Sequence, residues 1–296
     1  MKKIYSLLAA LIVFCSTASF SQMEIPYMGY NQVPSIYNPA SSVFAESFNF
    51  HGSYQNYWMG FDNAPEALNF NIFGNIHDNM GVSLNLHRTN INIFNQTQVE
   101  GGYSYRIRLS EESLLAFGVS LGLRKISANQ SSNPLDQFDP LLESDLFNQS
   151  HFSGGFGVSY QWNNLMVQAA APHLYFNSDF FNKYIFMVSY AVNALDDFQF
   201  RPMVMYRNFT PVKDDFQIRL QTTYLEQVHL EVGYGNDIHF MAGVGFSIGN
   251  VKLGYSYAIL HPSYSSISSG TNSIYAIYSI TRTQSSERIR YNLPLP

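Results

Sequence analysis

Residues 113–124 read Ser-Leu-Leu-Ala-Phe-Gly-Val-Ser-Leu-Gly-Leu-Arg, and from Leu115 onward a large apolar residue alternates with a small or polar one. Successive side chains of a β-strand point to opposite faces, so this stretch predicts a strand with one apolar face. The apolar face carries Leu115, Phe117, Val119, Leu121 and Leu123. The same alternation recurs in Val99–Leu109, Phe216–Tyr224, Ile238–Gly249 and Val251–Leu260.

About fourteen such segments follow one another between Phe48 and Arg282, and the connections between them alternate between long and short. An even number of antiparallel strands with tight turns at one end and longer loops at the other is typical of a transmembrane β-barrel. We therefore predict an all-β fold, an antiparallel transmembrane barrel of about fourteen strands. Longer loops are expected at Tyr57–Pro65, Thr89–Gln96, Ile126–Gln149, Pro172–Asn182, Asn208–Asp214 and His261–Thr271, with Gly235–Asp237 as a short exception.

The composition indicates which face meets lipid. The chain holds 21 Tyr and 24 Phe, and charged residues make up only 12% of it, whereas soluble domains carry about 25%. The polar faces of the predicted strands are rich in Gly and Ser instead of the Lys and Glu of a solvated surface. Small residues suit a barrel interior that something else partly fills, so the apolar faces are expected to point outward into lipid.

The two ends of the chain lie outside the predicted barrel, which takes residues 48–282. Residues 1–22 resemble a secretory signal peptide, with Lys2 and Lys3 before an apolar core. Cys15, the only cysteine, lies within it, and Phe14 is too bulky for a lipoprotein cleavage site. Residues 23–47 are rich in Pro and Asn and are expected to form a periplasmic entry or a plug in the lumen, and residues 283–296 a periplasmic tail.

The charge balance argues against a nucleic-acid partner. Loss of Lys2 and Lys3 with the signal peptide lowers Lys plus Arg from 16 to 14 against 21 Asp plus Glu, so the net charge changes from −5 to −7. A nucleic-acid-binding protein would instead present a basic patch.

Two Gly-x-Ser-x-Gly matches, at Gly118–Gly122 and Gly245–Gly249, raise the alternative of a hydrolase. Such a serine is a nucleophile when it lies on a sharp turn from a strand to a helix. Both matches instead lie within alternating strands, with Ser120 and Ser247 facing inward. A barrel phospholipase would place its serine and histidine on the outer face, so we expect no catalytic residues.

The charged and imidazole side chains of the predicted inner faces allow two further interpretations. His229, Glu231 and His239 are candidates for a metal site, although inward polarity explains them equally well. Arginines could pair with Glu100, with Glu231 or with the N-terminal segment, and we favour packing that rigidifies the lumen. We expect neither a metal nor a cofactor. The inward arginines are Arg106, Arg108, Arg124, Arg201 and Arg219.

An ordered set of motifs resembles the PorP/SprF family, outer-membrane proteins of the type IX secretion system of Bacteroidetes. Asn38-Pro39-Ala40 is followed by Trp58, Gly60, Phe61 and Pro65 in the pattern W-x-G-F-x-x-A-P. The later matches lie at Asn79–Ser83, Tyr103–Ile107, Phe117–Gly122 and Gly254–Tyr257. Two features depart from the family pattern: the tail after Thr283, and Asp139-Pro140 in place of a fuller acidic run.

The resemblance implies a non-enzymatic component of a protein-export machine in the outer membrane, in some members tied to gliding motility. It implies as partners a secreted cargo protein or the C-terminal signal domain of a large adhesin, periplasmic components of the secretion apparatus, and outer-membrane lipid. Seven motif residues are candidate partner contacts: Asn38, Pro39, Ala40, Trp58, Gly60, Phe61 and Pro65. The alternative function is an outer-membrane channel for small solutes or apolar molecules, because a fourteen-strand barrel needs a plug or leaves a pore.

Overall fold

The computed structural model describes residues 28–29, 31–60, 62–128, 149–175, 183–195, 197–209, 214–236, 238–260 and 268–281. The predicted signal peptide, the predicted tail, Phe61 and most of the predicted loop Ile126–Gln149 lie outside these residues. No helix within the described ranges is long and apolar enough to cross a membrane.

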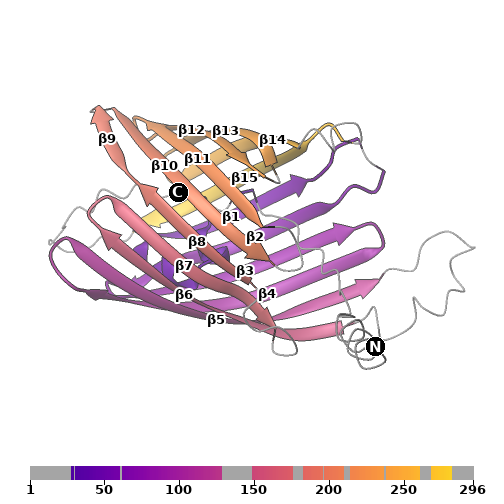
Figure 1. Cartoon of the computed structure of the whole chain (residues 1–296), viewed down its shortest axis with the longest axis horizontal. Helices are drawn as coiled ribbons and strands as arrows, with labels where there is room; N and C mark the ends of the chain where they lie inside the picture. Colours follow the sequence, from indigo (N-terminus) through magenta and orange to yellow (C-terminus); the bar gives the residue numbers. More distant parts are fainter. Residues whose placement is uncertain are drawn as a thin grey trace, which may run out of the picture.

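The strands form one closed antiparallel barrel, as the sequence predicts (Figure 1). Each strand pairs with its neighbours in the chain, and β1 pairs with β15 along a seam from Ser47–Thr281 to Asn56–Asn272. β8 and β9 both pair with β10 and are separated only at Ala191, so together they make one crossing, and the barrel has fourteen crossings. The strands are β1 (Ser47–Asn56), β2 (Glu66–His77), β3 (Met80–Ile91), β4 (Phe94–Arg108), β5 (Ser113–Ala128), β6 (Gln149–Trp162), β7 (Leu165–Tyr175), β8 (Lys183–Tyr190), β9 (Val192–Leu195), β10 (Phe198–Phe209), β11 (Asp215–Tyr224), β12 (Val228–Gly235), β13 (Ile238–Ile248), β14 (Val251–Leu260) and β15 (Thr271–Thr281).

The apolar faces point outward, which confirms the predicted inversion. In β5, Leu121 is 69% exposed while its neighbour Ser120 is 5% exposed. Most of the buried face is polar and includes His51, Asn71 and Glu100. An outward apolar face of this kind is typical of a barrel whose outer surface is covered by the acyl chains of a membrane.

The connections differ between the two ends of the barrel. One end, called here the short-turn end, carries the tight turns 78–79, 163–164, 225–227 and 249–250. The opposite, long-loop end carries the connections 57–65, 129–148 and 261–270.

The prediction of a long loop at Thr89–Gln96 is wrong. β3 continues to Ile91 and β4 begins at Phe94, with Thr89 paired to Gln96 and only residues 92–93 in the turn. Asn92 has φ +54°, and asparagine tolerates this left-handed conformation. The polar residues here do not end the strands, because the inner face of a barrel accommodates polar side chains.

Candidate functional site

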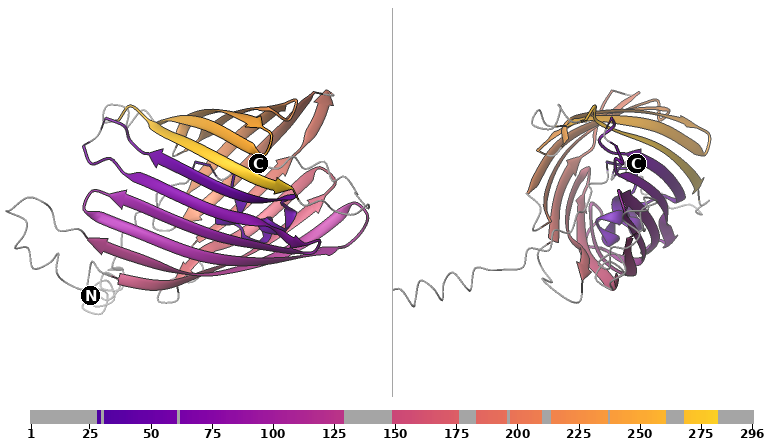
Figure 2. Two further views of the ribbon diagram at one scale, coloured as in Figure 1. Left: turned by 180° about the vertical axis from the view of Figure 1, so that it is seen from behind. Right: turned by 90° about the vertical axis from the view of Figure 1, so that its right-hand side faces the viewer.

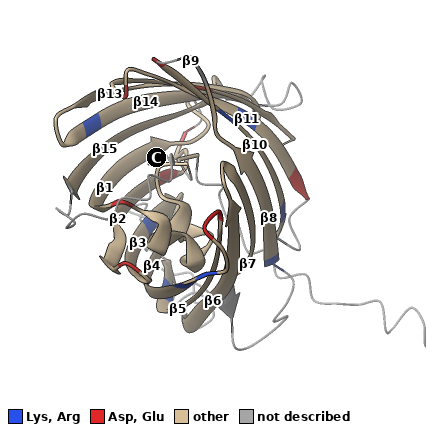
Figure 3. Ribbon diagram, turned by 90° about the vertical axis from the view of Figure 1, so that its left-hand side faces the viewer, with Lys and Arg blue, Asp and Glu red and all other residues tan. Residues whose placement is uncertain are grey.

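The described residues ahead of β1, 28–29 and 31–46, lie inside the barrel (Figures 2 and 3). Two short 3₁₀ helices, η1 (Pro34–Ile36) and η2 (Pro39–Phe44), precede β1 within the lumen, and η2 packs against the inner faces of β2 to β6. We call residues 38–44 the wedge, and the described residues 28–29 and 31–33 the strap. The lumen is thereby occupied by two pieces of the chain's own N-terminus.

Asn38 anchors the wedge to the wall. It is 1% exposed, and its side chain Oδ1 caps η2 by accepting a hydrogen bond from the Ala40 amide at 3.0 Å. Its Nδ2 donates to Ser159 Oγ of β6 at 3.0 Å. One carboxamide therefore satisfies a free helix amide and ties the helix to the barrel, as expected for an N-cap residue in a buried site. Further along, Ser42 Oγ lies 2.8 Å from Ser104 Oγ of β4.

Three glycines of the inner wall make room for the wedge. A Cβ atom added to Gly118 of β5 would meet the backbone of Pro39 and Ala40 and lie 2.6 Å from Ala40 Cα. The same atom on Gly81 of β3 would lie 2.6 Å from Val43 Cα, and on Gly157 of β6 it would meet the Asn38 side chain. At Gly81 and Gly118 the wall and the wedge therefore meet backbone to backbone, and at Gly157 the glycine leaves room for the Asn38 side chain.

An apolar contact joins the N-terminal segment to the opposite wall. Tyr37, 4% exposed, packs against inward side chains of β8 and β10. This patch interrupts an otherwise polar lumen. It consists of Ile185, Met187, Met203 and Met205.

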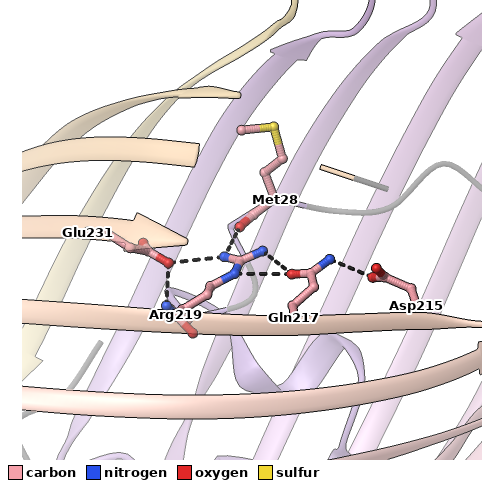
Figure 4. Close-up of polar contacts among 6 residues, drawn as sticks. Met28, Asp215, Gln217, Arg219 and Glu231 are labelled. Carbon is pink, nitrogen blue, oxygen red and sulfur yellow. Dashed lines mark hydrogen bonds and ion pairs between the residues drawn. The ribbon is translucent and has the colours of Figure 1, made fainter. Parts of the chain in front are cut away.

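The strap is held by a charged pair on β11 and β12 (Figure 4). Arg219 Nη1 donates to the Met28 carbonyl oxygen at 2.8 Å and lies 3.0 Å from Glu231 Oε1. The same Glu231 oxygen accepts a hydrogen bond from Asn31 Nδ2 at 2.5 Å. Gln217 Oε1 accepts from Nε and Nη2 of Arg219 at 3.2 and 2.8 Å. The Met28 side chain packs between Met241 and Ala258 of β13 and β14.

The sequence allows inward arginines to pair with Glu231 or with the N-terminal segment. Arg219 does both. Arg124 donates to Gln96 Oε1 at 2.6 Å. Arg207, for which no sequence pattern predicts a partner, forms a buried ion pair with Asp215 at 2.5 Å. Arg207 follows Met205 in a strand with apolar residues on both faces, so its inward direction is not evident from the pattern.

The two Gly-x-Ser-x-Gly matches contain Ser120 and Ser247. Among the hydrogen bonds of the described residues, only Ser247 of these two serines contacts a histidine. Its Oγ lies 2.8 Å from His229 Nε2, and His229 Nδ1 lies 3.2 Å from the Thr223 hydroxyl. The third group is thus a hydroxyl and not a carboxylate. The Ser247 amide donates to the Gln227 carbonyl at 2.7 Å, so it is not free to stabilise an oxyanion. In the other match, Gly118 is explained by the wedge.

The candidate metal ligands are not brought together. His229 pairs across the sheet with Gly245, whereas His239 lies near the other end of β13, with its ring 5.4 Å from that of Tyr234. Among the residues that the structure describes, no three His, Cys, Asp or Glu side chains are grouped as metal ligands.

The seven motif residues fall into two places. Asn38, Pro39 and Ala40 are buried against the inner wall, so in this conformation they contact the barrel itself. Pro65 is buried, Trp58 is half-buried and Gly60 is exposed at the long-loop end, while Phe61 lies outside the described residues.

The first loop at this end is fastened across the β1–β15 seam. The Met59 amide donates to the Gly270 carbonyl at 2.7 Å, and the Ser269 amide donates to the Met59 carbonyl at 2.8 Å. Trp58 is held beside this clamp with φ +53°, a conformation that is rare for a bulky residue. The clamp therefore fixes a strained tryptophan at the rim of the barrel.

Sequence reasoning missed the contacts that Met28 and Asn31 of the strap make with the wall, and the apolar contact of Tyr37. Met28 and Asn31 lie in a segment without periodicity, so no local pattern indicates what they contact. The inward methionines carried a weak signal, because β8 and β10 are apolar on both faces. Such strands indicate that part of the lumen is also apolar.

Comparisons with known proteins agree with this architecture. Among solved structures, three structures of two channels for aromatic hydrocarbons resemble the chain at low identity, so they show the fold alone. The TodX monoaromatic hydrocarbon channel (deltaS2 mutant) has a TM-score of 0.55 at 9% identity, over 83% of this chain and 93% of that one. The CymD monoaromatic hydrocarbon channel has a TM-score of 0.55 at 7% identity, over 90% and 96%. The Pseudomonas putida toluene transporter TodX has a TM-score of 0.53 at 9% identity, over 88% and 95%.

A search of curated protein sequences finds no significant match. The family model of the type IX secretion system membrane protein PorP/SprF, in contrast, matches residues 19–278. This range includes the wedge, the strap and all but the last residues of the barrel. The chain therefore belongs to the PorP/SprF family of type IX secretion system membrane proteins.

Proposed function

We propose that this protein is a non-enzymatic outer-membrane component of the type IX secretion machine, and that it serves the export or surface anchoring of a large secreted protein such as an adhesin. The family match over residues 19–278 carries this proposal. The occupied lumen supports an accessory role, because the wedge is built into the wall at Gly81, Gly118 and Gly157. The Ser247–His229 contact lacks a carboxylate and a free oxyanion donor, which supports the absence of hydrolase activity.

The proposed orientation places the long-loop end outside the cell and the short-turn end in the periplasm, as is usual for bacterial barrels. Residues 1–22 would act as a cleaved signal peptide, and the source would be a Bacteroidetes-type cell. The long loops, including 129–148 and 176–182, would then meet exported cargo, while the tail 283–296 would meet the periplasmic apparatus. Trp58, Gly60 and Pro65 belong to the outward rim in this orientation. Together with Phe61 they stay candidate partner contacts.

A deletion experiment tests the export role. Removing the gene should leave at least one large secreted protein inside the cell, and a plasmid copy should restore its release. If the proteins of the medium and the cell surface are the same with and without the gene, the export role is refuted. Removing residues 283–296 should reduce co-purification of periplasmic components while the barrel stays folded; undiminished co-purification would refute the role of the tail.

The second candidate function is a channel for small solutes or apolar molecules. The fold likeness to hydrocarbon channels and the inward apolar patch around Tyr37 favour it. Conductance in planar bilayers separates the two functions. A steady open pore in the unmodified protein supports transport, whereas a silent barrel supports the accessory role.

A further inference from the structure

The two luminal pieces of the N-terminus are held by different kinds of contact. The wedge meets the backbone of β5 directly over Gly118, and the Asn38 side chain satisfies both η2 and Ser159. The strap contacts side chains of its wall: Met28 packs against Met241 and Ala258 and its carbonyl accepts from Arg219, while Asn31 donates to Glu231. A backbone contact over a glycine leaves no alternative packing, whereas side-chain contacts can be exchanged for those of another peptide.

The charged pair would stay satisfied if the strap left. Arg219 keeps Glu231 at 3.0 Å and Gln217 at 2.8 and 3.2 Å, so no unpaired buried charge would result. Gln217 in turn donates to Asp215 Oδ2 at 2.6 Å, which holds its carboxamide toward Arg219. An unpaired buried charge is the main penalty for breaking a buried polar contact, and this arrangement avoids it.

Met28 and the wedge contact the wall near opposite ends of the barrel. Met28 contacts Met241 and Ala258, which lie near the long-loop ends of β13 and β14. Val43 of the wedge lies over Gly81, at the short-turn end of β3. The Met28 end of the strap is therefore nearer the long loops than the wedge is, while Val33 at its other end packs against Ala45 and Phe73. Release of the Met28 end would clear the β11–β14 side of the lumen.

We propose that the inner wall of β11–β14 is a peptide-binding site whose resident ligand is the strap, and that an extended segment of another polypeptide can replace the strap there. The ligand class follows from the contacts. Arg219 binds a main-chain carbonyl, Glu231 binds the carboxamide of an Asn or Gln three residues later, and Met241 with Ala258 accept an apolar side chain. This inference does not depend on the role in export.

Thiol labelling of the full-length protein in detergent tests strap release. Cys15 lies in the predicted signal peptide, so an introduced cysteine is the only thiol of the exported chain. Ala258→Cys reports on the strap and Ser42→Cys on the wedge, since both positions are fully buried. Asn31→Asp places a second carboxylate against Glu231 and should raise labelling at position 258 at least about tenfold. Labelling at position 42 should stay unchanged.

A charge swap provides the matched control. Asn31→Asp combined with Glu231→Gln exchanges carboxylate and carboxamide, so the pair can form again and labelling at position 258 should return to within about twofold of the parent. Glu100→Gln, the same change at a buried carboxylate of β4, should have no effect on either reporter. Parent-like labelling with Asn31→Asp alone, failure of the swap to restore protection, or equal labelling of both reporters would overturn the proposal.

A peptide with the sequence of residues 28–33, Met-Gly-Tyr-Asn-Gln-Val, tests the binding site itself. At millimolar concentration it should protect position 258 in the Asn31→Asp variant. The same peptide with aspartate in place of its asparagine should not protect. Equal effects of the two peptides, or no protection by either, would refute the binding site.

Discussion

Gly118→Ala should displace the wedge from its position against β5. The new Cβ atom would meet the main chain of Pro39 and Ala40, with Ala40 Cα at 2.6 Å, and neither backbone can yield as a flexible side chain would. Overpacking of this kind costs about 1–3 kcal/mol. Since about 1.4 kcal/mol changes an equilibrium tenfold, the open population should rise about 5-fold to about 150-fold.

The labelling rate of Ser42→Cys measures this population, because the residue is fully buried beside Ser104. Gly101→Ala is the matched control, since a Cβ atom there meets nothing within 4 Å. The barrel should stay folded in both variants, judged by its resistance to unfolding in detergent on a gel. Equal labelling of the Gly118 and Gly101 variants would refute the backbone-to-backbone contact.

Three further predictions concern the wedge, the lipid face and the rim. Asn38→Ala removes both the helix cap and the bond to Ser159, so it should weaken the wedge by about 1–3 kcal/mol and speed labelling of Ser42→Cys; an unchanged rate would contradict the role of Asn38. Leu121→Arg places a charge on the outer face and should lower the stability of the inserted barrel by about 2–4 kcal/mol in urea titrations in lipid, whereas Leu121→Phe should have little effect. Trp58→Gly relieves the φ of +53° and should leave stability unchanged or raise it by about 1 kcal/mol, and a clear loss would show that the indole ring stabilises the loop.

The barrel could be predicted from the sequence because large apolar residues on the lipid side alternate with small residues on the inner side. This alternation gives a clear period of two residues along each strand. In β5, Phe117, Val119 and Leu121 alternate with Gly118 and Ser120, and the structure keeps this register. The pattern fails where the lumen is itself apolar. In β8, Ile185 and Met187 point inward while Phe186 and Val188 point outward, so composition alone does not separate the faces.

The contents of the lumen could be predicted only in part. Alternation places Arg219 and Glu231 on neighbouring inner faces, which is why their pairing could be proposed. Their contacts with Met28 and Asn31 depend on the path of an aperiodic segment through the barrel, and no local pattern encodes that path. The role of the glycines under the wedge could not be predicted either, because only the position of η2 shows that a side chain there would collide with it.

The position of the wedge ahead of β1 bears on how the protein is assembled. Every strand pairing except β1 with β15 joins neighbours in the chain, so hairpins can form early and the seam joins the two ends of the sheet. The wedge contacts β2 to β6 and can dock on that half as soon as it exists as an open, curved sheet. The docked wedge then provides an internal surface around which the rest of the sheet can close.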